Sequence, residues 1–110
     1  MTEHKKKLLR PFVKTSIKDL RLRWNHFEMV WLQGTASKCN QSHFVLSDQS
    51  NSSIEVHHNR NIATNEGNYY QVLGETTSQG QIVKMVKMVE ITSQILMDMW
   101  PYELSDIQNA

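Results

Sequence analysis

The side chains that could do chemistry in this sequence are histidines and a cysteine, and their spacing matches no known type of site. The histidines stand at five positions: His4, His26, His43, His57 and His58. None of them forms an HExxH pattern or a spacing with Cys39 that is typical of zinc ligands. We therefore expect no metal and no cofactor, and we expect the histidines to lie at the surface or in turns.

Motifs for nucleotide or acyl chemistry are also missing from the sequence. It contains no GxxxxGKS/T loop, no GxGxxG and no GxSxG, and so predicts neither a phosphate cradle nor a nucleophile elbow. Because Cys39 is the only cysteine, no intrachain disulfide can form. The sequence predicts a non-catalytic, intracellular protein.

Charge is distributed unevenly along the chain. Residues 1–23 carry eight basic and two acidic side chains, a net charge of +6, whereas residues 24–110 carry four basic and nine acidic ones, a net charge of −5. A domain that holds nucleic acid by itself normally presents a basic groove. The acidic body disfavours such a role, and we expect residues 1–10 to be a basic, flexible N-terminus.

Methionine gives a more positive signal near the C-terminus. Four methionines lie close together in sequence: Met85, Met88, Met97 and Met99. They could simply fill the core. Yet the last segment also carries further apolar residues, namely Ile95, Leu96, Trp100 and Tyr102. Together they exceed what a small barrel core needs, and flexible thioethers and tryptophan are favoured at protein interfaces. We therefore interpret a helix over about residues 93–108 as a docking surface for a partner.

The elements that must position these residues follow from hydrophobic spacing. Val13, Ile17, Leu20 and Trp24 have helical spacing. Runs rich in β-formers predict strands over 27–36, 44–46, 54–56, 69–75 and 82–89. One helical turn could form around Ile62, and Thr92 or Ser93 can cap the last helix. Pro101 predicts a kink or a restart after Trp100.

Alternation along the predicted strand 82–89 indicates which face of the sheet each of its lysines lies on. Strict alternation places Ile82, Lys84 and Val86 on one face. The opposite face then carries Val83, Met85 and Lys87. The same alternation predicts that one ring of the Tyr69–Tyr70 pair faces inward and the other outward.

Length, composition and element order together define the fold class. A chain of 110 residues with 39% apolar content forms one domain with a lean core. Five short strands with a break between the third and fourth, flanked by helices, predict an all-β protein: a single OB-fold, a five-stranded Greek-key barrel spanning residues 11–110. A small antiparallel sandwich is the alternative.

Several segments resemble a known family in their order and spacing: VWLQGTA at 30–36, FVLSDQSNSSIEV at 44–56, NYYQVLGE at 68–75, VKM at 86–88 and MWPYELSDIQ at 99–108. They resemble the RecQ-mediated genome instability protein 2 family. The resemblance implies a non-catalytic nuclear subunit that pairs with the C-terminal OB domain of RecQ-mediated genome instability protein 1. It implies weak or no direct DNA binding.

The resemblance also implies a larger assembly around that pair. A type IA topoisomerase, topoisomerase III, and a Bloom-type RecQ helicase join it to dissolve double Holliday junctions, and a Fanconi anaemia M-type translocase is a further partner. The resemblance implies that Lys87 and Trp100 are partner-binding, and also Lys14 if the alignment is shifted by one residue. We also predict that Ile95, Leu96 and Met99 bind the partner, because they are apolar residues of the expected C-terminal helix.

A second hypothesis belongs to a different functional class. A small OB-fold subunit could bind single-stranded DNA or telomere ends, with the basic segment from Lys5 to Arg23 as its grip. The telomere-capping class shares this size and fold.

Overall fold

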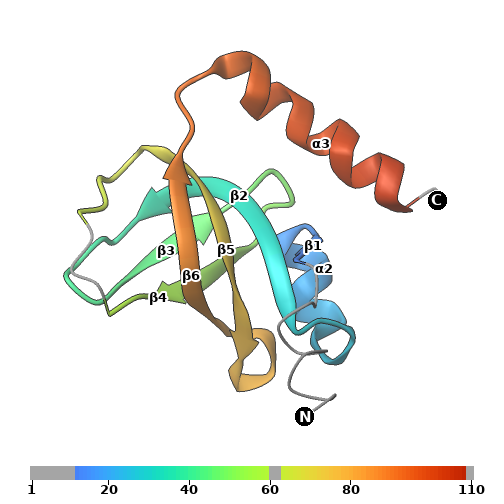
Figure 1. The fold of residues 1–110 in the computed structure, drawn as a ribbon, viewed down its shortest axis with the longest axis horizontal. Helices are drawn as coiled ribbons and strands as arrows, with labels where there is room; N and C mark the ends of the chain where they lie inside the picture. Colours follow the sequence, from blue (N-terminus) through green and yellow to red (C-terminus); the bar gives the residue numbers. More distant parts are fainter. Residues whose placement is uncertain (1–11, 60–62, 109–110) are drawn as a thin grey trace, which may run out of the picture.

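The strands of the protein close into a barrel (Figure 1). The computed structural model describes residues 12–59 and 63–108. The barrel strands are β2 (Met29–Ser37), β3 (His43–Ser47), β4 (Ser53–His57), β5 (Tyr69–Thr77) and β6 (Ile82–Glu90). They pair in the order β2–β3–β4–β6–β5, and β5 pairs back with β2 to complete the ring. The expected five-stranded OB-fold is confirmed, and the alternative of a small antiparallel sandwich is excluded.

The N-terminal elements differ from the single helix that spacing predicts. Val13 and Lys14 form a short strand, β1 (Val13–Lys14), which pairs in parallel with Val30 and Trp31 of β2. Helix α2 (Ile17–Leu22) begins only after Ser16, whose side chain accepts a hydrogen bond from the backbone N–H of Asp19 at 3.1 Å. A 3-10 turn, η1 (Trp24–His26), follows. The expected helical position of Val13 is therefore wrong, because its backbone pairs with a strand instead.

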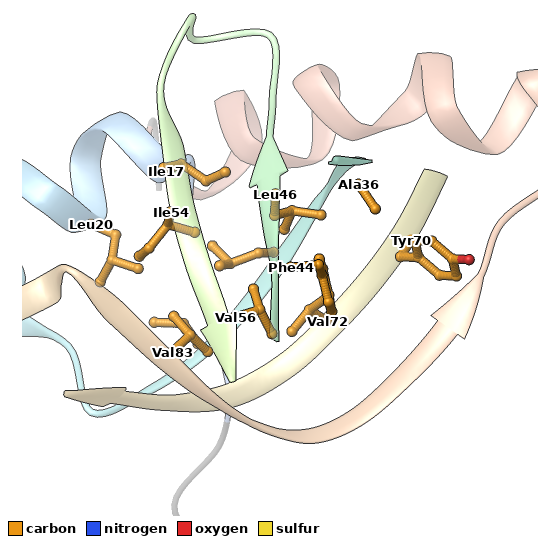
Figure 2. Packing of buried hydrophobic residues seen from close by; sticks show 12 residues of the cluster. Ile17, Leu20, Ala36, Phe44, Leu46, Ile54, Val56, Tyr70, Val72 and Val83 are labelled. Carbon is orange, nitrogen blue, oxygen red and sulfur yellow. The ribbon is translucent and has the colours of Figure 1, made fainter. Parts of the chain in front are cut away.

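The core lies inside the barrel and is closed at one end by α2. Figure 2 shows Ile17 and Leu20 of α2 pointing toward the strand residues around Phe44. The fully buried side chains include Ile17, Leu20, Val30, Leu32, Phe44, Leu46, Val56, Val72 and Val83. Tyr70 is buried while Tyr69 lies on the outer side, as alternation predicts. Burial of these apolar side chains supplies the main stabilisation of the fold.

Strand β6 departs from strict alternation, and this reverses the direction of Lys87. Gly74 pairs with Met85, whereas its neighbour Leu73 pairs with Lys87, so β6 carries one extra residue. Met85 and Met88 both pack against the core. Lys87 is exposed on the outer face, rather than sharing a face with Met85 as predicted. A bulge that is set by pairing with β5 is the physical cause.

Helix α3 (Gln94–Gln108) continues through Pro101 without ending. Ser93 caps it, since its hydroxyl accepts from the N–H of Leu96 at 3.4 Å. The expected restart at Pro101 is wrong, since one helix spans both sides of the proline. Trp100 before it and Glu103 after it contact Trp31 and Lys14, respectively. No helix in the described part of the chain is both long and apolar enough to cross a membrane. The basic residues 1–10 and the predicted turn at Ile62 lie outside the described residues.

Candidate protein-docking surface on helix α3

Helix α3 carries apolar residues on two opposite sides. One side, which faces the barrel, includes Trp100 at 2% exposure. The other side carries Ile95, Met99 and Tyr102, at spacings i, i+4 and i+7 that place them on one helical stripe. Their exposed fractions are 73%, 49% and 75%. A helix that is apolar on both sides is typical of one that packs between two surfaces.

The barrel-facing side is attached through a tryptophan pair and a lysine. The rings of Trp100 and Trp31 lie 6.3 Å apart between centroids. Lys14 Nζ stands 4.4 Å from the centroid of the Trp31 ring and 2.8 Å from Oε1 of Glu103. One ammonium group thus joins β1, β2 and α3 through a cation–π contact and an ion pair. We call Lys14, Trp31, Trp100 and Glu103 the helix clasp.

A polar row lies beside the helix clasp on the outer face of the barrel. The hydroxyl of Tyr69 donates to Oε1 of Gln33 at 3.1 Å, and Nε2 of Gln33 donates to Oε1 of Gln71 at 3.4 Å. Burial, with smaller contributions from Asp48 and Glu103, raises the pKa of Tyr69 to about 12. The phenol is protonated at neutral pH, as an ordinary tyrosine is, and its hydroxyl donates the hydrogen bond to Gln33 at one end of this row.

Exposed apolar area is not confined to one stripe of α3. Leu96 is 52% exposed, and Val86 and Val89 of β6 are 44% and 43% exposed. Clustered exposed apolar residues are typical of interaction sites, whereas isolated ones are ordinary. The outward surface of α3, defined as Ile95, Leu96, Met99 and Tyr102, is therefore the strongest candidate site for a protein partner.

The structure separates the predicted site residues into three groups. Ile95, Leu96 and Met99 lie on the outward surface. Lys14 and Trp100 belong to the helix clasp, and so lie behind that surface rather than on it. Lys87 is exposed on the outer face of β6, in a row with Leu73 of β5 and Trp31 of β2.

Sequence reasoning missed two members of the helix clasp, Trp31 and Glu103. Trp31 looks like an ordinary strand residue, and its alternation with Val30 and Leu32 was the only available signal that it faces outward. Glu103 lies 89 residues from Lys14 in sequence. No local pattern predicts an ion pair over such a separation.

Three of the five histidines, His43, His57 and His58, lie close together at the β3–β4 pair. His43 and His57 pair across the strands, with ring centroids 5.1 Å apart. His58 is only 6% exposed and packs near Phe44 at 6.0 Å between centroids. The expectation of surface histidines is therefore wrong for His58. Burial, and to a smaller extent the two neighbouring histidines, lowers its pKa. No group of three metal-ligating side chains that could hold an ion occurs within the described residues.

Solved structures with a similar fold come from telomere and replication proteins. The telomere capping protein Ten1 of S. pombe has a TM-score of 0.73 with 13% identity, over 91% of this chain and 100% of that one. The S. pombe Stn1–Ten1 complex gives a TM-score of 0.75 with 12% identity, over 93% and 96%. Replication protein A of U. maydis bound to single-stranded DNA gives 0.68 with 11% identity, over 87% and 92%. At these identities the likeness shows the fold.

Family membership comes from the sequence as a whole. No sequence among curated proteins matches this chain. The family model described as RecQ-mediated genome instability protein 2 matches residues 3–108, nearly the entire length. The match includes the strands of the barrel, the helix clasp and the outward surface of α3. This chain therefore belongs to the RecQ-mediated genome instability protein 2 family.

Proposed function

We propose that this chain is a non-catalytic OB-fold subunit that pairs with the C-terminal OB domain of RecQ-mediated genome instability protein 1. The observation that carries the proposal is the outward surface of α3, where Ile95, Met99 and Tyr102 remain exposed although the other side of the helix is already packed. Burying such side chains contributes about 1.5–3 kcal/mol each when burial is complete. A partner helix with its own apolar stripe is the natural complement.

The six predicted residues take different roles in this pairing. Ile95, Leu96 and Met99 contact the partner directly. Lys14 and Trp100 act as positioning residues, because they hold α3 against Trp31 and so fix the direction of the outward surface. Lys87 is exposed on the same outer face as Trp31, where it can meet a carboxylate at the rim of the interface.

The proposed pair works within a larger nuclear assembly that maintains genome stability. It stabilises a RecQ helicase and topoisomerase III for double Holliday junction dissolution, and it offers a surface to a Fanconi anaemia M-type translocase. Membership of the family supports this context. The chain itself would supply shape and contact area, while the chemistry of strand passage and unwinding belongs to its enzyme partners.

Charge insertion at the outward surface tests the pairing. The full chain is titrated with the purified OB domain by calorimetry, and Met99→Asp is compared with wild type. An unpaired carboxylate buried in an apolar interface should weaken binding by at least about 100-fold. Leu22→Asp is the matched control, since Leu22 is an equally apolar helical residue, 69% exposed, on α2. It should bind like wild type.

Two results would contradict the proposal. Wild-type affinity of Met99→Asp would show that the outward surface is not part of the interface. Equal loss in Leu22→Asp would show that added negative charge, rather than its place on α3, weakens binding. Circular dichroism and urea unfolding of both variants establish that each chain remains folded.

A telomere-type OB subunit is the second candidate, and the likeness to Ten1 is what favours it. It would use the same outward surface on a different large subunit. Affinity purification of the tagged full chain, with identification of the co-eluting large subunit, separates the two. Recovery of a large OB protein of the telomere class, and none of the dissolution class, would replace the first proposal with the second.

A further inference from the structure

A second surface, on α2 and η1, combines basic side chains with an exposed aromatic ring. Its members are Lys18, Arg21, Leu22, Arg23 and Trp24, all of them exposed. We call these five residues the basic corner. Trp24 is 41% exposed and Leu22 69%. Nothing in the pairing proposed above uses these side chains.

Trp24 is exposed but well anchored. Its Cβ lies so close to Gly80, in the turn η2 (Ser78–Gly80), that a Cβ added at residue 80 would stand 2.5 Å from it. Gly80 also has a φ of 80°, a conformation that glycine adopts most easily. The base of the indole side chain therefore packs against the β5–β6 turn while part of the ring faces solvent. An ordered, exposed ring of this kind can stack on a nucleobase at low entropic cost.

The cations of the basic corner are partly pre-oriented. One guanidinium nitrogen of Arg21 donates to the carbonyl oxygen of Ser53 at 3.2 Å. Arg23 approaches the carboxylate of Asp19 at 4.0 Å, and Lys18 extends from the same short helix. Asp48 accepts a hydrogen bond from the backbone N–H of Ile17 at the start of α2. Lys18, Arg21 and Arg23 outnumber the carboxylates of Asp19 and Asp48 at this helix, so the region keeps a net positive charge. The rest of the body is acidic in sequence.

The basic corner borders a cleft that also reaches helix α3. Val13, Asp19 and Arg23 line one cleft of about 380 Å³, together with Leu104 from α3. Since Leu104 is the α3 residue in this cleft, the outward surface of that helix points away from it.

We propose that the basic corner binds the backbone of single-stranded nucleic acid, with Trp24 stacking on one base. Arginine and lysine contacts to phosphates supply attraction without sequence preference. A fixed aromatic ring next to cations suits a nucleotide better than an acidic peptide, which has no planar base to stack. The contact is weak in the isolated chain, and it adds to DNA contacts made elsewhere when the chain is part of an assembly.

Fluorescence anisotropy of the full chain with labelled oligo-dT tests this proposal at several salt concentrations. Binding should weaken with salt, with a slope of about −0.7 in log Kobs per phosphate neutralised. The double variant Arg21→Glu/Arg23→Glu should lose more than about tenfold in affinity. The matched control, Lys84→Glu/Lys87→Glu, makes the same charge change on β6 and should lose much less, because those lysines lie outside the basic corner.

Trp24→Ala separates stacking from simple charge attraction. Removal of one stacked ring should lower the affinity about tenfold and leave the salt slope nearly unchanged. Equal losses in the two double variants would overturn the proposal, since they would indicate general electrostatic attraction. So would wild-type affinity of Trp24→Ala together with equally strong binding of polyglutamate, which would point to an acidic protein ligand. All variants are compared with wild type by circular dichroism before titration.

Discussion

The barrel strands and helix α3 differ in how far their apolar residues are buried. In strands such as β2 and β3, inward residues like Leu32 and Phe44 are fully buried and alternate with outward ones. In α3, apolar residues occur on both sides, and one side remains exposed. The difference separates stability from recognition: residues inside the barrel hold the fold, while residues on the outward surface can change with little effect on folding. The predictions below test that separation.

The largest expected effect is on the barrel. Phe44→Ala should lower the free energy of unfolding by about 3–5 kcal/mol, because it leaves a cavity among fully buried side chains. Ile95→Ala, on the outward surface, should change it by less than about 0.5 kcal/mol. Guanidinium unfolding followed by circular dichroism measures both values. A similar loss of unfolding free energy in the two variants would contradict this, because it would show that the outward surface of α3 contributes to stability as the barrel core does.

Trp100→Ala should act locally rather than globally. It removes the main apolar contact between α3 and Trp31, and a 15-residue helix has little stability in water by itself. Hydrogen exchange should accelerate strongly in residues 94–108 and only slightly in β2 to β6. Uniform acceleration across the chain would indicate that α3 is part of the cooperative barrel core.

Acid should weaken the barrel more than it weakens the attachment of α3. The pKa of His58 is lowered below its ordinary 6.5, chiefly by burial, so the unfolded chain binds a proton there at higher pH than the folded chain. Stability from this group is complete above pH 6.5 and declines as the pH falls from 6.5 toward the lowered value. His43, His57 and Glu55 are the nearby titratable groups.

Urea midpoints between about pH 7.5 and about pH 5 measure this decline. His58→Gln should flatten the pH dependence, whereas His26→Gln, at an exposed position, should preserve it. A wild-type midpoint that stays constant over this range would contradict the assignment to His58.

The smallest effect is expected at the lysine of the helix clasp. Lys14→Met keeps most of the aliphatic chain but removes the ion pair to Glu103 and the cation–π contact to Trp31. Both contacts are partly exposed to solvent, so the loss should be about 0.5–1 kcal/mol. The difference between Lys14→Met and wild type in thermal unfolding should shrink at high salt. Lys84→Met, an exposed lysine of β6, serves as the comparison and should leave stability unchanged.

Local pattern was sufficient to predict much of the fold. Strand positions followed from alternation of β-forming residues, and the inward direction of Tyr70 followed from the same rule. Thr92 and Ser93 were both recognisable as possible helix caps because capping depends on residues within one turn, and the structure selects Ser93. The exposed stripe of Ile95, Met99 and Tyr102 was visible in the sequence as an apolar surplus for a core of this size.

The sequence by itself therefore determined the order of the five barrel strands, the barrel class and the apolar character of α3, since these depend on neighbouring residues. Tertiary structure alone decided that Lys87 faces outward and that α3 runs unbroken through Pro101. It also decided that Trp100 faces inward, against Trp31. The reason is the same each time: the direction of a side chain depends on register and contacts with segments far away in sequence, and no local spacing contains that information.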